Sequence, residues 1–318
     1  MTEPQYPANP ADAALRLFLR WFGRNYARAV SVREKEAADY GLRAGLTVGR
    51  QWSLEVAVAD TLTPDSELEW EAARAAIEQR LDAGGQSLAL WVPRGAPLPT
   101  QEPELSQLIA AAELAPDLGD GRKELRRRVR LYLRRTSTTG SVITVLGGLA
   151  ASWAQFTNRV PGSFQLNSTE LFRLPNQPEE REELAERIVM AAGQPDVDDS
   201  TVLPAEDVWT LNDLEEGGSC VLGTPKPDND EQSAALRRNL RTLLRSARSV
   251  LGQQADAKAL VVLGSATYAD EEKLSWALRG MDPTLYSGYD IIAVVADGAV
   301  KLLLQPGRSQ LPWDAPLR

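Results

Sequence analysis

Apolar side chains return every three or four positions near both ends of the chain, which is the spacing of one face of an α-helix. The first such segment covers about 11–30, and the same spacing continues to about Tyr40, where glycines begin to interrupt it. The most regular segment covers 231–251, and its apolar positions are Leu236, Leu240, Leu243, Leu244, Ala247 and Leu251. Shorter helices are predicted over about 63–81, 179–192 and 270–279.

Alternation of apolar and polar positions predicts β-strands in the first half of the chain. Over 54–58 the alternation is typical of a strand with one buried face, and a second strand is predicted over 87–92. A strand, a helix and a strand joined by short connections favour a βαβ unit, whose two strands run parallel.

Apolar runs near the C-terminus predict three further strands, over 260–263, 291–296 and 300–304. Asp297 and Gly298 separate the last two runs, and an Asp-Gly pair between strands is a strong signal for a β-hairpin. Because 291–296 is apolar without interruption, we expect this strand to be covered on both faces.

The segment 126–135 alternates arginines with apolar residues around Tyr132. Together with the β-branched run 142–145, it predicts a hairpin whose outer face carries arginines around one tyrosine. A helix is the alternative, because the apolar positions of this segment also fit the helical period. Between 122 and 135 there are eight basic residues against one acid, Glu124, the highest density of positive charge in the chain.

Length and composition set the expected organisation of the chain. With 318 residues the chain has room for two domains, and 43% hydrophobic with 25% charged residues is typical of a globular protein. Residues 176–231 hold 16 acids and only three basic residues, with several prolines and glycines, which is typical of a connector. We therefore predict a mixed α/β fold of two modules, 1–175 and 232–318, joined by an acidic connector with one short helix.

The chain contains no histidine and a single cysteine, Cys220, and these two counts exclude several classes of functional site. They rule out histidine-based catalysis, an ordinary zinc site and an internal disulfide. The phosphate-binding glycine loops of nucleotide-binding folds are also missing, so no cofactor is expected. No apolar stretch is long enough for a membrane span, and no signal peptide is evident, so we expect a cytoplasmic protein.

Arginine side chains form three groups at the spacing of predicted elements. The first group lies at four-residue intervals on the N-terminal helix: Arg16, Arg20, Arg24 and Arg28. The second follows the predicted hairpin: Arg126, Arg127, Arg128, Arg130, Tyr132 and Arg134. The third lies on the helix at 231–251: Arg237, Arg241, Arg245 and Arg248. Phosphate backbones are common partners of such groups, so these residues are candidate nucleic-acid contacts that would converge in one groove.

Three functions remain open from the sequence. The first is a non-catalytic subunit of a larger assembly that binds DNA or RNA through its arginines. The second is a protein-interaction module whose arginines meet acidic partners. The third is a Mg²⁺-dependent nuclease or an eroded relative of one, since carboxylates alone can hold Mg²⁺. The candidate acids for that site are Glu55 and Asp60, with Glu34, Glu36, Asp290 and Asp297 as further carboxylates.

Overall fold

The structure is a computed structural model of the chain. It describes residues 10–61, 68–85, 87–119, 121–147, 158–175, 177–194, 201–215, 217–224, 232–251, 255–265, 271–305 and 311–314. The chain forms two compact units. Unit 1 comprises residues 1–100, 119–122 and 211–318, and unit 2 comprises 101–118 and 123–210. The mixed α/β class is confirmed, whereas the division into modules at 175 and 232 stays a prediction.

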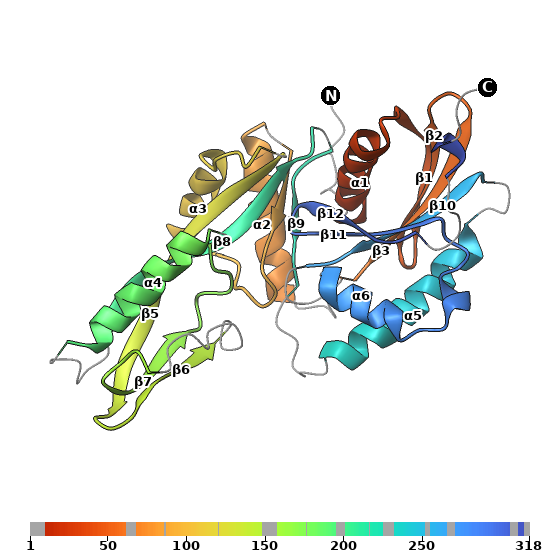
Figure 1. Ribbon diagram of the computed structural model, residues 1–318. Helices are drawn as coiled ribbons and strands as arrows, with labels where there is room; N and C mark the ends of the chain where they lie inside the picture. Colours follow the sequence, from red (N-terminus) through yellow and green to blue (C-terminus); the bar gives the residue numbers. More distant parts are fainter. Residues whose placement is uncertain are drawn as a thin grey trace. The chain divides into compact units, whose positions relative to one another are not determined.

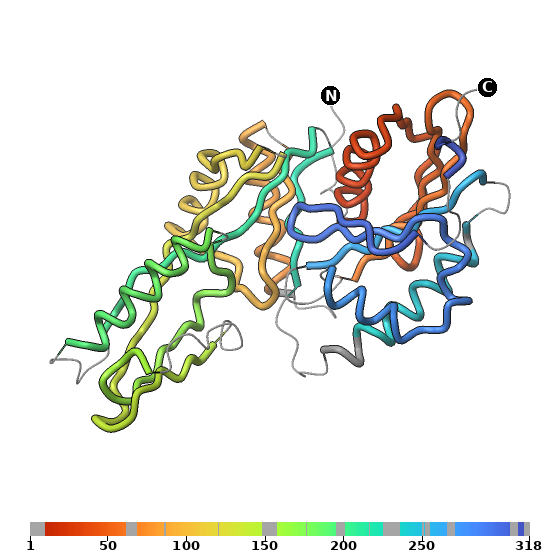
Figure 2. The backbone as a smooth tube through the Cα atoms, viewed as in Figure 1, coloured from red at the N-terminus to blue at the C-terminus, as the bar shows by residue number. Residues whose placement is uncertain are grey.

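Unit 1 is built on a six-stranded sheet with the order β1-β2-β3-β10-β11-β12. Its strands are β1 (Val30–Ala38), β2 (Gly41–Val48), β3 (Trp52–Asp60), β10 (Ala257–Leu263), β11 (Ile291–Ala296) and β12 (Ala299–Leu304). The central strands β3, β10 and β11 run parallel, and the outer neighbours pair antiparallel. Figure 2 shows the backbone of the first strands, in orange, beside that of the last strands, in blue.

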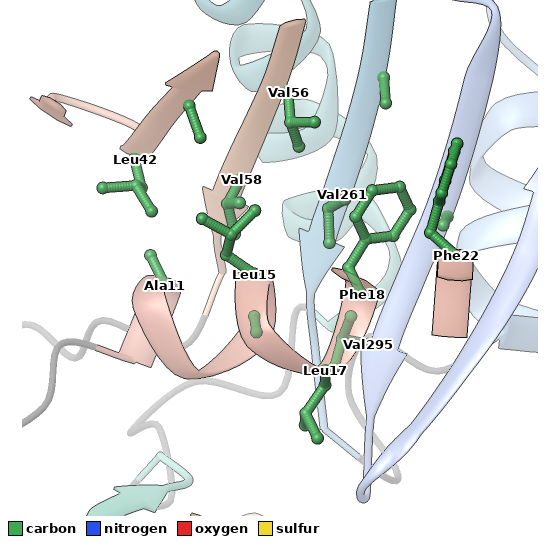
Figure 3. Packing of buried hydrophobic residues seen from close by; sticks show 14 of the residues in the cluster. Ala11, Leu15, Leu17, Phe18, Phe22, Leu42, Val56, Val58, Val261 and Val295 are labelled. Carbon is green, nitrogen blue, oxygen red and sulfur yellow. The ribbon is translucent and has the colours of Figure 1, made fainter. Parts of the chain in front are cut away.

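Helices cover both faces of this sheet (Figure 1). On one face lies α1 (Pro10–Tyr26), whose Leu15 packs near Val58 of β3 and whose Phe18 packs near Val261 of β10 (Figure 3). On the other face lie α5 (Gln232–Val250) and α6 (Glu271–Arg279), which bury the alternate residues of the same strands. Successive side chains of a strand point to opposite faces, so the middle positions of β10 and all of β11 are apolar without alternation.

A second, smaller element of unit 1 is the parallel pair β4 (Leu88–Trp91) and β9 (Cys220–Leu222), next to α2 (Leu68–Ala83). Trp91 of β4 and Leu222 of β9 belong to the same apolar cluster as the buried residues of α1. The helix α1 therefore packs against this strand pair as well as against the six-stranded sheet. Two short 3₁₀ turns complete the unit, η2 (Pro283–Leu285) and η3 (Pro312–Asp314). In the described part of the chain, no helix is both long and apolar enough to cross a membrane.

Unit 2 combines strands in the order β6-β7-β5-β8 with two helices. Its elements are α3 (Glu104–Glu113), β5 (Arg122–Ser137), β6 (Ser141–Gly147), β7 (Gly162–Ser168), α4 (Pro178–Ala192) and β8 (Thr201–Asp213). The first residue of β5 and the last three of β8 belong to unit 1. Leu184 and Ile188 of α4 pack against the apolar side chains of one sheet face, among them Leu131 and Leu166.

Several expectations from the sequence are confirmed. The structure places α5 at 232–250 and α4 at 178–192, close to the predicted 231–251 and 179–192. The C-terminal order of strand, helix and hairpin is correct, and β11 is buried along most of its length. The first residues predicted for the helices at 63, 231 and 270 lie outside the described residues.

The N-terminal part differs from the expectation in two places. Residues 30–38 form the edge strand β1 rather than a continued helix. The side chains of this strand are nearly all exposed and several are charged, as is common for an edge strand. Such a sequence has no buried face to distinguish it from a solvent-exposed helix. Moreover, β3 is buried on both faces, and its neighbours are β2 and β10. The predicted parallel pairing of 54–58 with 87–92 is therefore wrong, since β4 pairs with β9 instead.

The strand at 126–135 is confirmed, but the hairpin with 142–145 is wrong. The strand β7 lies between the two, antiparallel to β5 and parallel to β6. The helical alternative for this segment is also wrong. The acidic segment 176–231 contains β8 and β9 in addition to the predicted helix.

Candidate nucleic-acid interface

The central strand of the candidate interface is β5, and its two faces differ sharply. Val129, Leu131 and Leu133 point toward α4 and are buried. Their neighbours on the opposite face include Arg130 and Arg134, which are exposed, and Tyr132, which is half-buried. The sequence predicted this alternation, and the structure confirms it.

The register of the sheet extends this exposed face over two more strands. Tyr132 of β5 pairs with Asn167 of β7, which in turn pairs with Leu146 of β6. In the next row, Arg134 pairs with Gln165, and Gln165 with Thr144. Paired residues project from the same face of a sheet. We call this surface the open face, and its residues are Arg130, Tyr132, Arg134, Val142, Thr144, Leu146, Gln165 and Asn167. Arg128 instead lines a groove together with Glu180, Glu183 and Arg187 of α4.

The charge on the open face is positive. The guanidinium groups of Arg130 and Arg134 form no ion pair with any carboxylate of the described residues. One acid lies nearby, because Glu170 accepts the backbone N–H of Arg130 through Oε2 at 3.1 Å. Alternate residues of a strand lie about 6.6 Å apart, so Arg130, Tyr132 and Arg134 form a row along β5.

Two other arginines of this strand are engaged within unit 2. Arg126 forms ion pairs with Glu124, Glu180 and Glu206 at 2.7–3.0 Å, and these carboxylates raise its pKa. Arg127 stacks over the ring of Trp209, at 4.2 Å from the ring centre. Both guanidinium groups therefore stabilise unit 2 and are poorly placed to bind phosphate.

Arg127 also lies near a buried acid. Asp207 is fully buried and accepts the backbone N–H groups of Phe172 and Arg173 and the indole N–H of Trp209. Burial raises the pKa of Asp207 and lowers that of Arg127. Since the two charged groups are 3.9 Å apart, each compensates part of the desolvation cost of the other.

Arg16, Arg20 and Arg24 of the predicted stripe lie on α1, whereas Arg28 follows the end of the helix at Tyr26. Several of these side chains are already engaged. Arg16 pairs with Asp12 at 3.0 Å, and Arg28 donates to the backbone oxygen of Trp313 at 2.8 Å. Arg20 donates to the backbone oxygen of Asp213. Arg24 is exposed, and together with Arg20 it lines a cavity of unit 1.

The arginines of α5 lie on the exposed side of that helix, as predicted: Arg237, Arg241, Arg245 and Arg248. Arg248 donates to the backbone oxygen of Thr284. Because α1 and α5 cover opposite faces of the sheet, their arginines do not share a groove. The expectation that these two groups converge is therefore wrong.

The candidate carboxylates do not assemble into a metal site. Glu55 is buried and accepts a hydrogen bond from Arg43 at 3.0 Å, which also lies near Glu34 and Glu36. Asp60 ends β3, away from this group. Within the described ranges, no three acidic or cysteine side chains come close enough together to hold a metal ion.

The remaining candidates have structural roles. Asp290 accepts the backbone N–H of Lys258, and Asp297 occupies the left-handed position of the turn between β11 and β12. Cys220 is buried, and burial raises the pKa of its thiol. A thiol of this kind is a packing residue rather than a nucleophile.

The sequence analysis missed the residues that β7 adds to the open face, Gln165 and Asn167. Their signal is the alternation with Phe164 and Leu166, which spans too few positions to stand out. No family model, no curated protein and no solved structure matches this chain.

Proposed function

We propose that this protein binds single-stranded nucleic acid on the open face of unit 2, as a non-catalytic member of a larger assembly. The observation that carries the proposal is a pair of exposed arginines, Arg130 and Arg134, on either side of Tyr132 on a sheet face whose other side is covered by α4. These guanidinium groups have no carboxylate partner among the described residues. They are therefore available to phosphate.

The chemistry of the open face favours a single strand over a duplex. Tyr132 lies within a sheet surface, where only an unstacked base can reach its ring. Any of the bases can stack on such a ring, and the neighbouring arginines neutralise the phosphates. The amide of Gln165 offers a donor and an acceptor to base edges, and that of Asn167 offers its N–H groups, since its Oδ1 already accepts the backbone N–H of Thr169 at 3.0 Å. The exposed Leu146 would contact the base or sugar.

The net charge of −9 opposes binding of a polyanion at long range. At physiological ionic strength, charges separated by more than about 8 Å are largely screened. Local contacts on the open face therefore decide the affinity, and this affinity depends strongly on salt.

The test is fluorescence anisotropy with labelled 20-nucleotide single strands of DNA and RNA over a series of salt concentrations. Two phosphate contacts, at Arg130 and Arg134, predict a slope of about −1.4 in log K against log salt, at roughly −0.7 per contact. The double variant Arg130→Gln/Arg134→Gln should reduce the slope by about 1.4. Tyr132→Ala should weaken binding by about 1–3 kcal/mol without changing the slope.

The matched control is Arg33→Gln/Arg50→Gln, which removes the same charge from exposed positions in unit 1. It should leave binding by the open face almost unchanged. Equal losses in both double variants would show a nonspecific charge effect and contradict the proposal, as would the absence of any salt-dependent binding.

A protein partner is the competing function, and one observation favours it. Val142 and Leu146 are 39% and 43% exposed on the open face, which suits an apolar contact. Pull-down with and without nuclease treatment separates the two functions. Partners recovered equally after complete digestion would favour direct protein binding over the nucleic-acid proposal.

A further inference from the structure

Unit 1 contains a cavity of about 550 Å³ where α5 ends, next to the first residues of β10 and the turn η2. This volume is within the range of about 300–1,000 Å³ that is typical of small-molecule sites. The residues that line it include Arg245, Arg248, Leu251, Lys258, Leu285 and Gly288. All of them belong to unit 1.

Three cationic side chains line this cavity, and none of its described lining residues is acidic: Arg245, Arg248 and Lys258. The side chains of Arg245 and Lys258 form no hydrogen bond or ion pair in the part of the chain that the structure describes. Like charges around one small volume raise the local potential, which an anionic ligand would relieve.

The third cation, Arg248, is held in place without losing its charge. Its Nη1 donates to the backbone oxygen of Thr284, which is a neutral acceptor. Its guanidinium group also lies against Gly288, where an added Cβ would be 3.1 Å from Nε. A guanidinium group has five N–H groups, so the bond to Thr284 leaves others for a ligand.

The acids that are close to the lining residues in sequence do not neutralise these cations: Asp256, Asp282 and Asp290. Each of them accepts a backbone N–H at 2.8–2.9 Å, from Ser53, Thr284 and Lys258 respectively. Among the described residues, none of the three forms an ion pair with a cationic side chain of the cavity. The C-terminal end of α5 adds about half a negative charge, which is less than the charge of one arginine.

Hydrogen bonds join the three segments that surround the cavity. The hydroxyl of Tyr289 donates to the backbone oxygen of Leu244 in α5 at 2.8 Å. On the other side, the backbone N–H of Asp290 donates to the backbone oxygen of Lys258 in β10 at 2.7 Å. The backbone around the site is therefore fixed before any ligand arrives, which lowers the cost of binding.

The cavity also has an apolar wall. Leu285 is half-buried and Leu251 is buried, and both line the cavity beside the cations. Such a wall matches the organic part of a small molecule, whereas the cations match an anionic group.

We propose that this cavity binds a small phosphomonoester, with the phosphoryl group among Arg245, Arg248 and Lys258 and the organic part against Leu285. A phosphomonoester carries about two negative charges at neutral pH and above, and it offers three acceptor oxygens. Arginine binds such oxygens through paired N–H groups, and lysine binds them as a point charge. The site belongs to unit 1 and does not depend on the open face of unit 2.

The test is isothermal titration calorimetry of the full chain with phenyl phosphate at about pH 8, where its phosphoryl group is fully ionised. Phenyl phosphate should bind, and Arg245→Gln/Lys258→Gln should weaken it at least about tenfold, since each change removes a charge-assisted contact. Neither side chain has a partner among the described residues, so the fold should tolerate the changes. The control Arg33→Gln/Arg50→Gln should bind phenyl phosphate as the unmodified chain does.

Two further probes define the ligand. Phenyl sulfate has the same shape but one negative charge, so it should bind at least about fivefold more weakly than phenyl phosphate. Inorganic phosphate lacks the ring that contacts Leu285, so it should bind at least about threefold more weakly. Equal affinity for either probe would overturn the proposal.

The open-face variant separates this proposal from the preceding one. Arg130→Gln/Arg134→Gln should leave the binding of phenyl phosphate unchanged, because its substitutions lie in unit 2. No binding of phenyl phosphate at millimolar concentration, or equal losses in Arg245→Gln/Lys258→Gln and in the open-face variant, would each overturn the assignment to this cavity.

Discussion

Glu78 of α2 shows how a single buried carboxylate can make stability depend on pH. Its side chain is almost completely buried and accepts the backbone N–H of Val221 at 2.9 Å, with Arg74 as its nearest cation at 3.6 Å. Desolvation is the largest influence and raises the pKa of Glu78 to about 7. The hydrogen bond and Arg74 lower the pKa, whereas Glu71 and Asp82 raise it further.

The raised pKa gives a prediction with a definite sign. The folded chain holds a proton on Glu78 between about pH 4.5 and 7 that the unfolded chain has lost, so the free energy of unfolding falls as pH rises through this window. Glu78→Gln should therefore match the unmodified chain near pH 4.5 and be more stable at pH 8, by about 2–3 kcal/mol. Urea unfolding at both pH values measures the difference.

The exposed Glu69→Gln on the same helix is the control for this measurement. It should change stability by less than about 0.5 kcal/mol at either pH. A Glu78→Gln variant that is less stable than the unmodified chain at pH 8 would show that Glu78 is needed as a carboxylate.

At the scale of elements, the amphipathic pattern of α5 predicts which positions stabilise unit 1. Leu240 is buried against the sheet, whereas its neighbour Arg241 is exposed. We expect Leu240→Ala to lower the free energy of unfolding by about 2–5 kcal/mol, because it removes buried apolar volume. Arg241→Ala should change it by less than about 0.5 kcal/mol, and similar losses in both variants would contradict the assigned helix face.

The elements that sequence analysis identified are those with a complete buried face. In α5 the apolar positions from Leu236 to Ala247, and in β11 the positions from Ile291 to Ala296, contact the core, so the periodicity is easily recognised. In β1 nearly all side chains are exposed, so no periodicity marks the strand. In β2 the glycines resemble helix breakers, although Gly41 is required because a Cβ there would lie 2.6 Å from the backbone oxygen of Val58.

The candidate site was predictable only in part, for a similar reason. The alternation in β5 is local, so the exposed arginines and Tyr132 could be identified. Their neighbours Gln165 and Asn167 depend on the pairing of β5 with β7, about thirty residues away, which no local pattern reports. The cavity at the end of α5 brings Lys258 beside Arg245 and Arg248, a distribution that only the folded chain reveals.

At the scale of the whole molecule, unit 1 is assembled from both ends of the chain. The strand β10 pairs with β3 along seven residues, and α5 and α1 bury opposite faces of the same sheet. Neither the N-terminal nor the C-terminal part can bury its apolar residues without the other.

We therefore expect that the fragment 232–318, produced alone, will show no cooperative thermal unfolding, and that the fragment 1–231 will show only the transition of unit 2. Produced together, they should associate and recover a transition close to that of the intact chain, since the β3–β10 pairing does not require the connection. Circular dichroism and size-exclusion chromatography measure both outcomes. A cooperative transition in 232–318 alone would instead support the independent C-terminal module that the sequence predicted.

The placement of unit 2 within the sequence of unit 1 also affects biosynthesis. After β3 leaves the ribosome, about 200 residues must be translated before β10 can pair with it, which takes roughly 10–40 seconds at ordinary elongation rates. During this interval the nascent chain exposes an unpaired apolar strand edge, the kind of surface that recruits other chains. The yield of soluble protein should therefore depend on growth temperature and chaperone supply more than the stability of the finished fold would indicate.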